Sequence, residues 1–246
     1  MTGPPGTGKT SLSFAIAGHF NLDVHCISLA ESSITEEDLV LLFDELPEKC
    51  LVLLEDVDCA GLVDRARLPL NNRALPARGI SGNGSDNDVP RISLSGLLNV
   101  IDGIASHEGR VLIMTTNHVD SLDAALLRPG RVDLCIHFEL ATKKQAEDLF
   151  LRTFVEKSDQ NSQGTTITAG DKGSLNQMAL AFSAEIPEHV LSPAEIQGFL
   201  MNWKKQPAEA VARAREWVEE SMKEKKDKAA AKLLDDKVIE ADIPSL

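Results

Sequence analysis

The sequence predicts an α/β fold, a parallel sheet covered by helices, followed by a small helical domain. Up to residue 141, short apolar runs alternate with amphipathic helical patterns, and this alternation is typical of parallel sheets. A glycine-rich loop opens the chain, and beyond residue 141 the pattern is wholly helical. We therefore divide the chain into an α/β domain at 1–141, a helical domain at 142–205, and a charged C-terminal helix and tail at 206–246.

The glycine-rich loop matches the phosphate-binding pattern G-x-x-x-x-G-K-T over residues 3–10. Its glycines allow a tight curl in which backbone N–H groups point inward at phosphate oxygens. Lys9 supplies a positive charge for the β- and γ-phosphates, and Thr10 supplies a hydroxyl for Mg²⁺. A helical pattern at Ser11–His19 places a positive helix end at the same point. The loop predicts ATP and Mg²⁺ as cofactors, with the nucleotide contacted by Gly3, Pro4, Pro5, Gly6, Thr7, Gly8, Lys9, Thr10 and Ser11.

Four apolar runs in the α/β domain predict strands, because continuous runs are typical of strands buried on both faces. The predicted strands are Asp23–Leu29, Cys50–Leu54, Arg110–Thr116 and Leu134–Leu140. Helices are predicted between them. They begin at the capping box Thr35-Glu36-Glu37-Asp38, cover Ser93–Ile101, where Asp102-Gly103 ends the helix, and cover Leu122–Leu127.

Three acids, Glu55, Asp56 and Asp58, follow the strand Cys50–Leu54, and Asn117 follows the strand Arg110–Thr116. Ligands of open α/β sheets bind at the carboxyl ends of the strands. We therefore expect these acids to face the phosphate loop.

The helical domain is predicted to contain helices at Thr142–Val155, Ser174–Phe182 and Ser192–Trp203, with a turn-rich stretch at Gly164–Gly173. Ser192 and Glu195 form a second capping box. The mixed lysines and glutamates of Ala208–Lys237 predict a long helix with a solvated face.

Charge and composition exclude several classes of function. The net charge of −13 opposes binding to nucleic acid. No apolar run is long enough to cross a membrane, and no targeting segment is present, so any membrane contact would come from segments outside this sequence. Residues 61–92 are rich in Gly, Asn, Ser and Arg and predict an insertion loop without a part in phosphate chemistry.

Seven stretches together resemble one branch of the AAA ATPases, the mitochondrial cytochrome b–c complex assembly chaperone that moves the folded Rieske protein across the inner membrane. The stretches are GPPGTGKT at Gly3–Thr10, SLAESS at Ser28–Ser33, LVLLEDVD at Leu51–Asp58, SGLLNVIDG at Ser95–Gly103, MTTNH at Met114–His118, LDAALLRPGRVD at Leu122–Asp133 and SPAEIQGFLM at Ser192–Met201. The resemblance covers residues 1–205. It implies a P-loop NTPase module with a helical lid domain, and a location at the mitochondrial inner membrane.

The resemblance also implies a role for each polar residue around the loop. Thr10, Glu55 and Asp56 match the positions that hold Mg²⁺ and polarise the attacking water, and we favour Asp56 for the water because this chain has Glu-Asp where most AAA proteins have Asp-Glu. Asn117 matches the polar sensor. Arg128 and Arg131 match arginine fingers that reach the nucleotide of the adjacent subunit in a homo-oligomeric ring.

The expected function is therefore ATP hydrolysis that drives translocation or assembly of a protein cargo, as in a chaperone. Two alternatives stay open. One is an ATP-binding module that does not hydrolyse ATP and is only structural. The other is a peptide-threading unfoldase, which the lack of aromatic residues at 21–42 and 44–137 disfavours.

The resemblance implies one further strand, which enters the phosphate loop between the strand ending at Asn117 and the strand Leu134–Leu140. The sequence has no residues for it. Because neighbouring strands lie about 4.8 Å apart, we expect a vacant slot roughly 9–10 Å wide. Unpaired buried backbone groups are costly, so we also expect low stability and doubtful ATPase activity for this chain.

Overall fold

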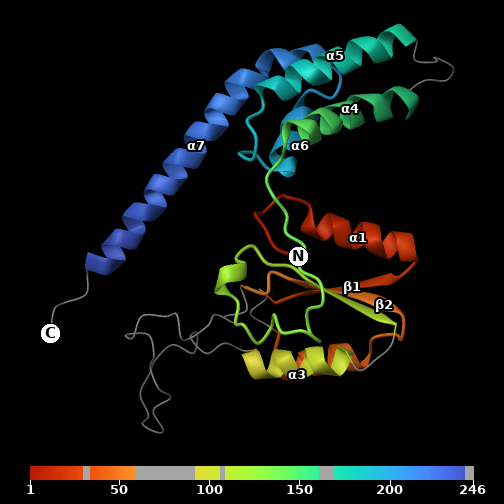
Figure 1. Cartoon of the computed structure of the whole chain (residues 1–246), viewed down its shortest axis with the longest axis vertical. Helices are drawn as coiled ribbons and strands as arrows, with labels where there is room; N and C mark the ends of the chain where they lie inside the picture. Colours follow the sequence, from red (N-terminus) through yellow and green to blue (C-terminus); the bar gives the residue numbers. More distant parts are fainter. Residues whose placement is uncertain (30–33, 59–91, 106–108, 161–168, 242–246) are drawn as a thin grey trace. The chain divides into compact units, whose positions relative to one another are not determined.

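The computed structural model describes the chain apart from residues 30–33, 59–91, 106–108, 161–168 and 242–246. The predicted insertion at 61–92 therefore lies outside the described residues except for Ile92, which is buried. The chain forms two compact units, Met1–Phe138 and Glu139–Leu246 (Figure 1). In the described part of the chain, no helix has the length and apolar character needed to span a membrane.

The first unit is built on a parallel sheet of three strands in the order β1-β2-β3. The strands are β1 (Asp23–Ser28), β2 (Cys50–Glu55) and β3 (Arg110–Met114). Cys50 of β2 pairs with Asp23 on one side and with Arg110 on the other, so the three carboxyl ends lie at one edge. Residues 50–54 of the central strand are wholly buried, as their continuous apolar run predicts.

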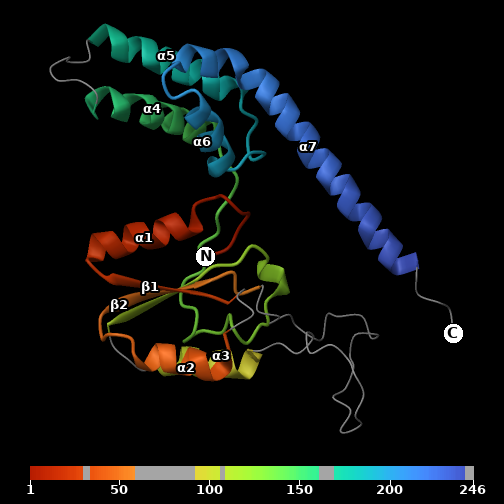
Figure 2. The same cartoon turned by 180° about the vertical axis from the view of Figure 1, so that it is seen from behind.

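Helices cover both faces of this sheet (Figures 1 and 2). On one face α1 (Lys9–Phe20) packs its Ala17 in a cluster with Leu51 and Leu53 of β2. On the other face α2 (Glu36–Asp44) and α3 (Leu94–Ala105) pack against Val52 and Leu54. Alternate side chains of β2 therefore pack on opposite faces of the sheet. This confirms the prediction of a parallel sheet covered by helices on both faces.

The segment Leu134–Leu140, predicted as a strand, forms only an isolated parallel bridge, between His137 and Thr2. Thr2 also bridges to Thr116. Met1 and Thr2 thus occupy the carboxyl end of the slot that was expected to be vacant. Beyond them β3 and residues 134–136 border a cavity of about 580 Å³.

Two other predictions in this unit are wrong. The predicted helix Leu122–Leu127 is absent: residues 124–127 form turns, and the 3₁₀ helix η2 (Val119–Ser121) precedes the segment. Pro129 and Gly130 follow so closely that a full helical turn has no room to propagate. Helix α3 continues through Asp102-Gly103 to Ala105 instead of ending there.

Over its described residues the second unit consists of four helices, α4 (Lys143–Gln160), α5 (Ala169–Glu185), α6 (Pro193–Asn202) and α7 (Pro207–Ala241). Its core is a chain of aromatic contacts with ring centroids 4.4–6.1 Å apart. The rings belong to Phe154, Phe150, Phe182, Phe199 and Trp217. Helix α5 begins within the stretch 164–173 that was predicted to be turns.

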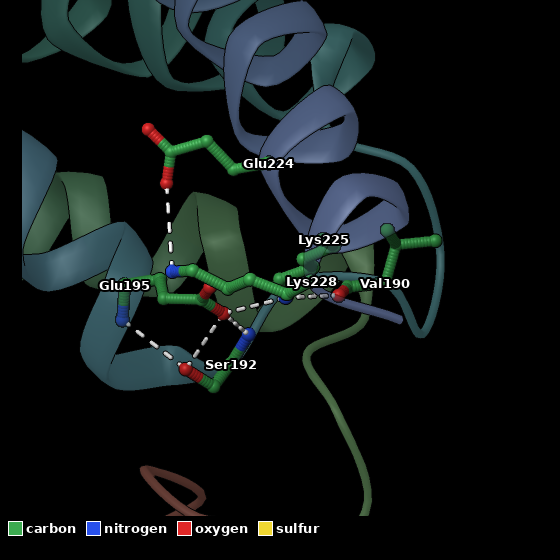
Figure 3. Close-up of polar contacts among 6 residues, drawn as sticks. All are labelled: Val190, Ser192, Glu195, Glu224, Lys225 and Lys228. Carbon is green, nitrogen blue, oxygen red and sulfur yellow. Dashed lines mark hydrogen bonds and ion pairs between the residues drawn. The ribbon is translucent and has the colours of Figure 1, made fainter. Parts of the chain in front are cut away.

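Helix α7 has the solvated face that its sequence predicts, and its other face is buried. Ala210, Ala214 and Val218 are buried in the core of this unit. Farther along, Lys225 donates through its Nζ atom to the carbonyl of Val190 at 2.7 Å and to Glu195 Oε2 at 2.9 Å (Figure 3). The first half of α7, up to Lys225, therefore packs in the core of the helical unit, because small residues on one face let it approach closely.

Candidate nucleotide-binding site

The phosphate loop has a backbone that only glycine adopts readily. Gly3, Gly6 and Gly8 have φ angles of 136°, 74° and 102°, in the region where side chains are strained. A Cβ atom on Gly3 would lie 2.1 Å from the carbonyl oxygen of Phe138. This close approach exists because Thr2 and Phe138 pair through a 2.7 Å hydrogen bond from Phe138 N to Thr2 O. The pairing fixes where the loop leaves the sheet.

The loop ends at the N-terminus of α1, where Gly8 is the N-cap and no side chain caps the helix. The first N–H groups of a helix have no partner within it, and they give this end a partial positive charge. Ser11 is exposed in the first turn, and the Thr7 hydroxyl donates to Pro4 O at 2.8 Å. The first turn of α1 therefore presents unpaired donors of the kind that bind phosphate.

Lys9 is nearly buried, with 8% of its surface exposed. Its Nζ atom donates to Gly3 O at 2.7 Å, to Pro4 O at 3.0 Å and to Asn117 Oδ1 at 2.8 Å. Burial lowers the pKa of Lys9, and the nearby charges of Asp56 and Asp58 offset part of that shift. The ammonium group is thus held by the loop itself and by the end of a neighbouring strand segment.

The two acids at the end of β2 have separate partners. Glu55 Oε1 accepts a 2.7 Å hydrogen bond from the Thr10 hydroxyl. Asp56 Oδ1 accepts one of 3.1 Å from Asn117 Nδ2. The structure therefore brings Glu55, Asp56 and Asn117, which lie at strand ends, together with Thr10 of α1 beside Lys9.

Asp56 has a left-handed backbone with a φ angle of 51°, which is uncommon for a residue other than glycine. Its N–H group donates to the hydroxyl of Thr115 at 3.2 Å, and Thr115 is buried. Asp58 Oδ1 accepts from the backbone N–H of Asn117 at 3.3 Å. Thr115 was not among the predicted site residues, and its position beside Asn117 at the end of β3 was the available signal.

A magnesium ion fits this set of side chains. Among the described residues, no three His, Cys, Asp or Glu side chains are grouped closely enough to hold a metal on their own. Mg²⁺ commonly takes one or two protein oxygens and completes its octahedron with phosphate and water. The adjacent Thr10 hydroxyl and Glu55 carboxylate offer such a pair, 2.7 Å apart.

The two predicted arginine fingers lie apart from this network and differ from each other. Arg128 is exposed at the surface, and its side chain has no partner among the described residues. Arg131 forms a bidentate ion pair with Asp102, and both N–O distances are 2.7 Å. In the described part of the chain neither arginine hydrogen-bonds to the phosphate loop of its own subunit.

Comparison with known proteins agrees with this geometry. Residues 1–140 match the model of the ATPase family associated with various cellular activities (AAA), and residues 143–216 match the lid domain of ATPases like the mitochondrial chaperone BCS1. A probable mitochondrial chaperone BCS1-A from Dictyostelium discoideum is 39% identical over 86% of this chain and 44% of its own length. The human mitochondrial chaperone BCS1 is 38% identical over 87% of this chain and 45% of its own length.

The chain thus spans less than half the length of the curated relatives it matches. The two family models nevertheless meet at the boundary between the two compact units, one on each side. The first model covers more than half of the chain and contains the whole site. The chain belongs to the AAA ATPase family, and its second unit is a lid domain of the BCS1 type.

Proposed function

We propose that this protein is an ATP hydrolase whose turnover drives translocation or assembly of a protein cargo, with the chain working as a module of a homo-oligomeric ring. The observation that carries the proposal is the connected set of polar contacts from Lys9 through Asn117 to Asp56, beside the contact between Thr10 and Glu55. It places a cation, an amide, an acid and a hydroxyl around the uncapped end of α1.

Phosphoryl transfer is catalysed mainly by positioning and by stabilising charge. In our proposal the N–H groups of Gly6, Gly8 and Thr10 and the ammonium of Lys9 hold the phosphates of ATP. Thr10 and Glu55 hold Mg²⁺, which when bound neutralises charge on the phosphate oxygens. Lys9 would exchange its contacts with Gly3 O and Pro4 O for contacts with phosphate.

Asp56 is the residue we assign to the attacking water. Its carboxylate is free of the Thr10 contact that Glu55 makes, so one acid serves the metal and the other remains available as a base. Asn117 holds Asp56 Oδ1 through its Nδ2 atom, which fixes the direction of that carboxylate. The assignment explains how the reversed acid order of this chain performs the usual two tasks.

Within the segment 128–131, we assign Arg128 as the arginine finger that contacts the nucleotide of the neighbouring subunit. Its exposure supports a role in trans. A positive charge supplied by a neighbour stabilises charge that develops on the transferred phosphoryl group. By similarity with the chaperones named above, we propose a mitochondrial inner-membrane setting and a protein as cargo.

Replacement of Asp56 by Asn tests the proposal, because Asn tolerates the left-handed backbone at this position. We expect ATP binding to be retained and kcat to fall about 10²- to 10⁴-fold. Asp44→Asn, an exposed acid at the end of α2, is the matched control and should leave both unchanged. Binding is measured by calorimetry and turnover by phosphate release.

Two results would overturn parts of the proposal. Full turnover in the Asp56→Asn protein would exclude Asp56 as the base. ATP binding without any turnover in the unmutated protein would favour the purely structural module instead.

A further inference from the structure

Arg131 is held within its own subunit by every nitrogen of its guanidinium group. Nε and Nη2 donate to the two carboxylate oxygens of Asp102, each at 2.7 Å, and Nη1 donates to the carbonyl of Ala125 at 2.8 Å. The side chain is only 20% exposed. Bidentate pairs of this geometry are among the stronger polar contacts in proteins and have a fixed direction.

The three contacts join two segments that are distant in sequence. Asp102 lies near the end of α3, whereas Ala125 and Arg131 lie at the two ends of one turn segment. Arg131 therefore closes the segment 125–131 on itself and attaches it to α3. The backbone supports the same closure, because Arg131 N and Val132 N both donate to Arg128 O at 3.1 Å.

Arg128 lies between these two attachment points and is exposed. A side chain that must reach a neighbouring subunit needs a fixed base, since a misplacement of about 1 Å can lower a rate about 100-fold. The clamp by Arg131 provides such a base. An arginine that already makes three hydrogen bonds, to one carboxylate and one carbonyl, is poorly suited to leave them in each catalytic cycle.

We propose that Arg131 is a positioning residue and not a second arginine finger: with Asp102 it clamps the segment 125–131 on α3, so that Arg128 alone extends toward the neighbouring nucleotide. The inference rests on the proposed ATPase function and divides between the two arginines a role that the sequence assigned to both. Asp102 thereby becomes a residue needed for turnover although it contacts no nucleotide.

The test compares Asp102→Asn with Arg131→Ala in the purified protein. If Arg131 acts only through its pair with Asp102, both variants should lower kcat by a similar factor, about 10- to 100-fold, with little change in KM. The double variant should then be no worse than either single one. Asp102→Glu keeps a carboxylate and should restore most of kcat. Asp133→Asn is the control: Asp133 is an exposed acid close to Arg131 in the sequence, and its replacement should leave kcat unchanged.

The opposite result is equally clear. If Arg131 reaches a nucleotide, Asp102→Asn releases it, and kcat stays at or above that of the unmutated protein while Arg131→Ala abolishes turnover. That pattern would overturn the inference, and so would additive losses in the double variant. Hydrogen exchange of amides 123–132 should rise in both single variants, which separates loosening of the segment from global unfolding.

The proposed ATPase function is tested separately from the clamp. Chains with Arg128→Ala and chains with Asp56→Asn should each be inactive and should regain turnover when mixed, because each supplies what the other lacks at a shared interface. If the unmutated protein is folded and binds ATP but does not hydrolyse it, the proposed function is removed. Success there with a silent Asp102→Asn would remove only the clamp.

Discussion

The N-terminus of α1 and the N-terminus of α6 begin similar helices in opposite ways. Helix α6 has a complete capping box, in which Ser192 and Glu195 satisfy each other's N–H groups. Helix α1 begins at Gly8 without a side-chain cap. In α6 the first N–H groups are hydrogen-bonded to side chains, which stabilises the helix, whereas in α1 they remain available to bind an anion. The difference separates a helix end that holds the lid together from one that we propose binds ATP.

The backbone around the uncapped end of α1 adopts conformations that are unfavourable for most residues. Gly3, Gly6, Gly8 and Asp56 all have positive φ angles near the site, and conformations of this kind concentrate where function requires them. The start of α6 has ordinary extended geometry at Ser192. Stability and binding are thus assigned to different helix ends of one chain.

The largest expected effect on stability comes from Gly3→Ala, in the phosphate loop that leads to the uncapped N-terminus of α1. The added Cβ would meet Phe138 O at 2.1 Å on a backbone with φ of 136°, so we expect a loss of about 3 kcal/mol or more in the first unit. Hydrogen exchange of the β2 amides measures it. Gly18→Ala on α1 has open space around it and should instead stabilise by roughly 0.5–1 kcal/mol. If the two variants changed the stability of the first unit by the same amount, the predicted strain at Gly3 would be contradicted.

A smaller effect is expected when the capped end loses its outer support. Lys225→Met removes the donor shared by Val190 O and Glu195 (Figure 3) and should destabilise the lid by about 1–2 kcal/mol, since both partners are partly exposed. Lys228→Met is the matched control, because among the described residues the ion pair of Lys228 is with Glu224 on the surface, and its loss should cost at most a few tenths of a kcal/mol.

The chain offers a convenient probe for these lid measurements. Both of its tryptophans, Trp203 and Trp217, lie in the second unit. Urea titrations followed by tryptophan fluorescence therefore report on the lid alone. A midpoint that moves equally in the Lys225 and Lys228 variants would show that the link between α7 and α6 does not stabilise the lid.

Removal of the cap itself should have a slightly smaller effect. Ser192→Ala deletes the hydroxyl that accepts from Glu195 N at 3.3 Å, and loss of such a cap costs about 1 kcal/mol. The same fluorescence titration measures it, and ATP affinity measured by calorimetry should not change. A loss of ATP binding in this variant would break the division of labour between the two helix ends.

At the capped end, acid pH should produce the smallest effect. Burial alone would raise the pKa of Glu195, but hydrogen bonds from Lys225 and Ser192 outweigh it and lower the pKa. A carboxyl with a depressed folded pKa stabilises the protein above its unfolded value of about 4.3 and loses that contribution as pH falls through the folded value. The fluorescence midpoint should therefore drop below about pH 4.3, and Glu195→Gln should reduce that drop.

Much of the fold could be predicted because its signals are local. The glycines and Lys9 of the phosphate loop, the boxes at Thr35 and Ser192, and the apolar runs of β1, β2 and β3 each lie within a few residues of the chain. A motif of this kind carries its own hydrogen-bond partners or its own periodicity. The gathering of Glu55, Asp56 and Asn117 beside Lys9 followed from one topological rule about strand ends.

What tertiary structure alone decided depends on partners far away in sequence. Leu134–Leu140 has the composition of a strand, yet among the described residues its one strand bridge joins His137 to Thr2. Arg131 and Arg128 look alike in the sequence, and the ion pair with Asp102, 29 residues before Arg131, distinguishes them. The charged helix α7 joins the lid through Lys225 and Val190, which are 35 residues apart. The sequence by itself determined which groups exist at each helix end and strand end, whereas folding decided which of them are left unpaired, because pairing depends on distances that no local pattern contains.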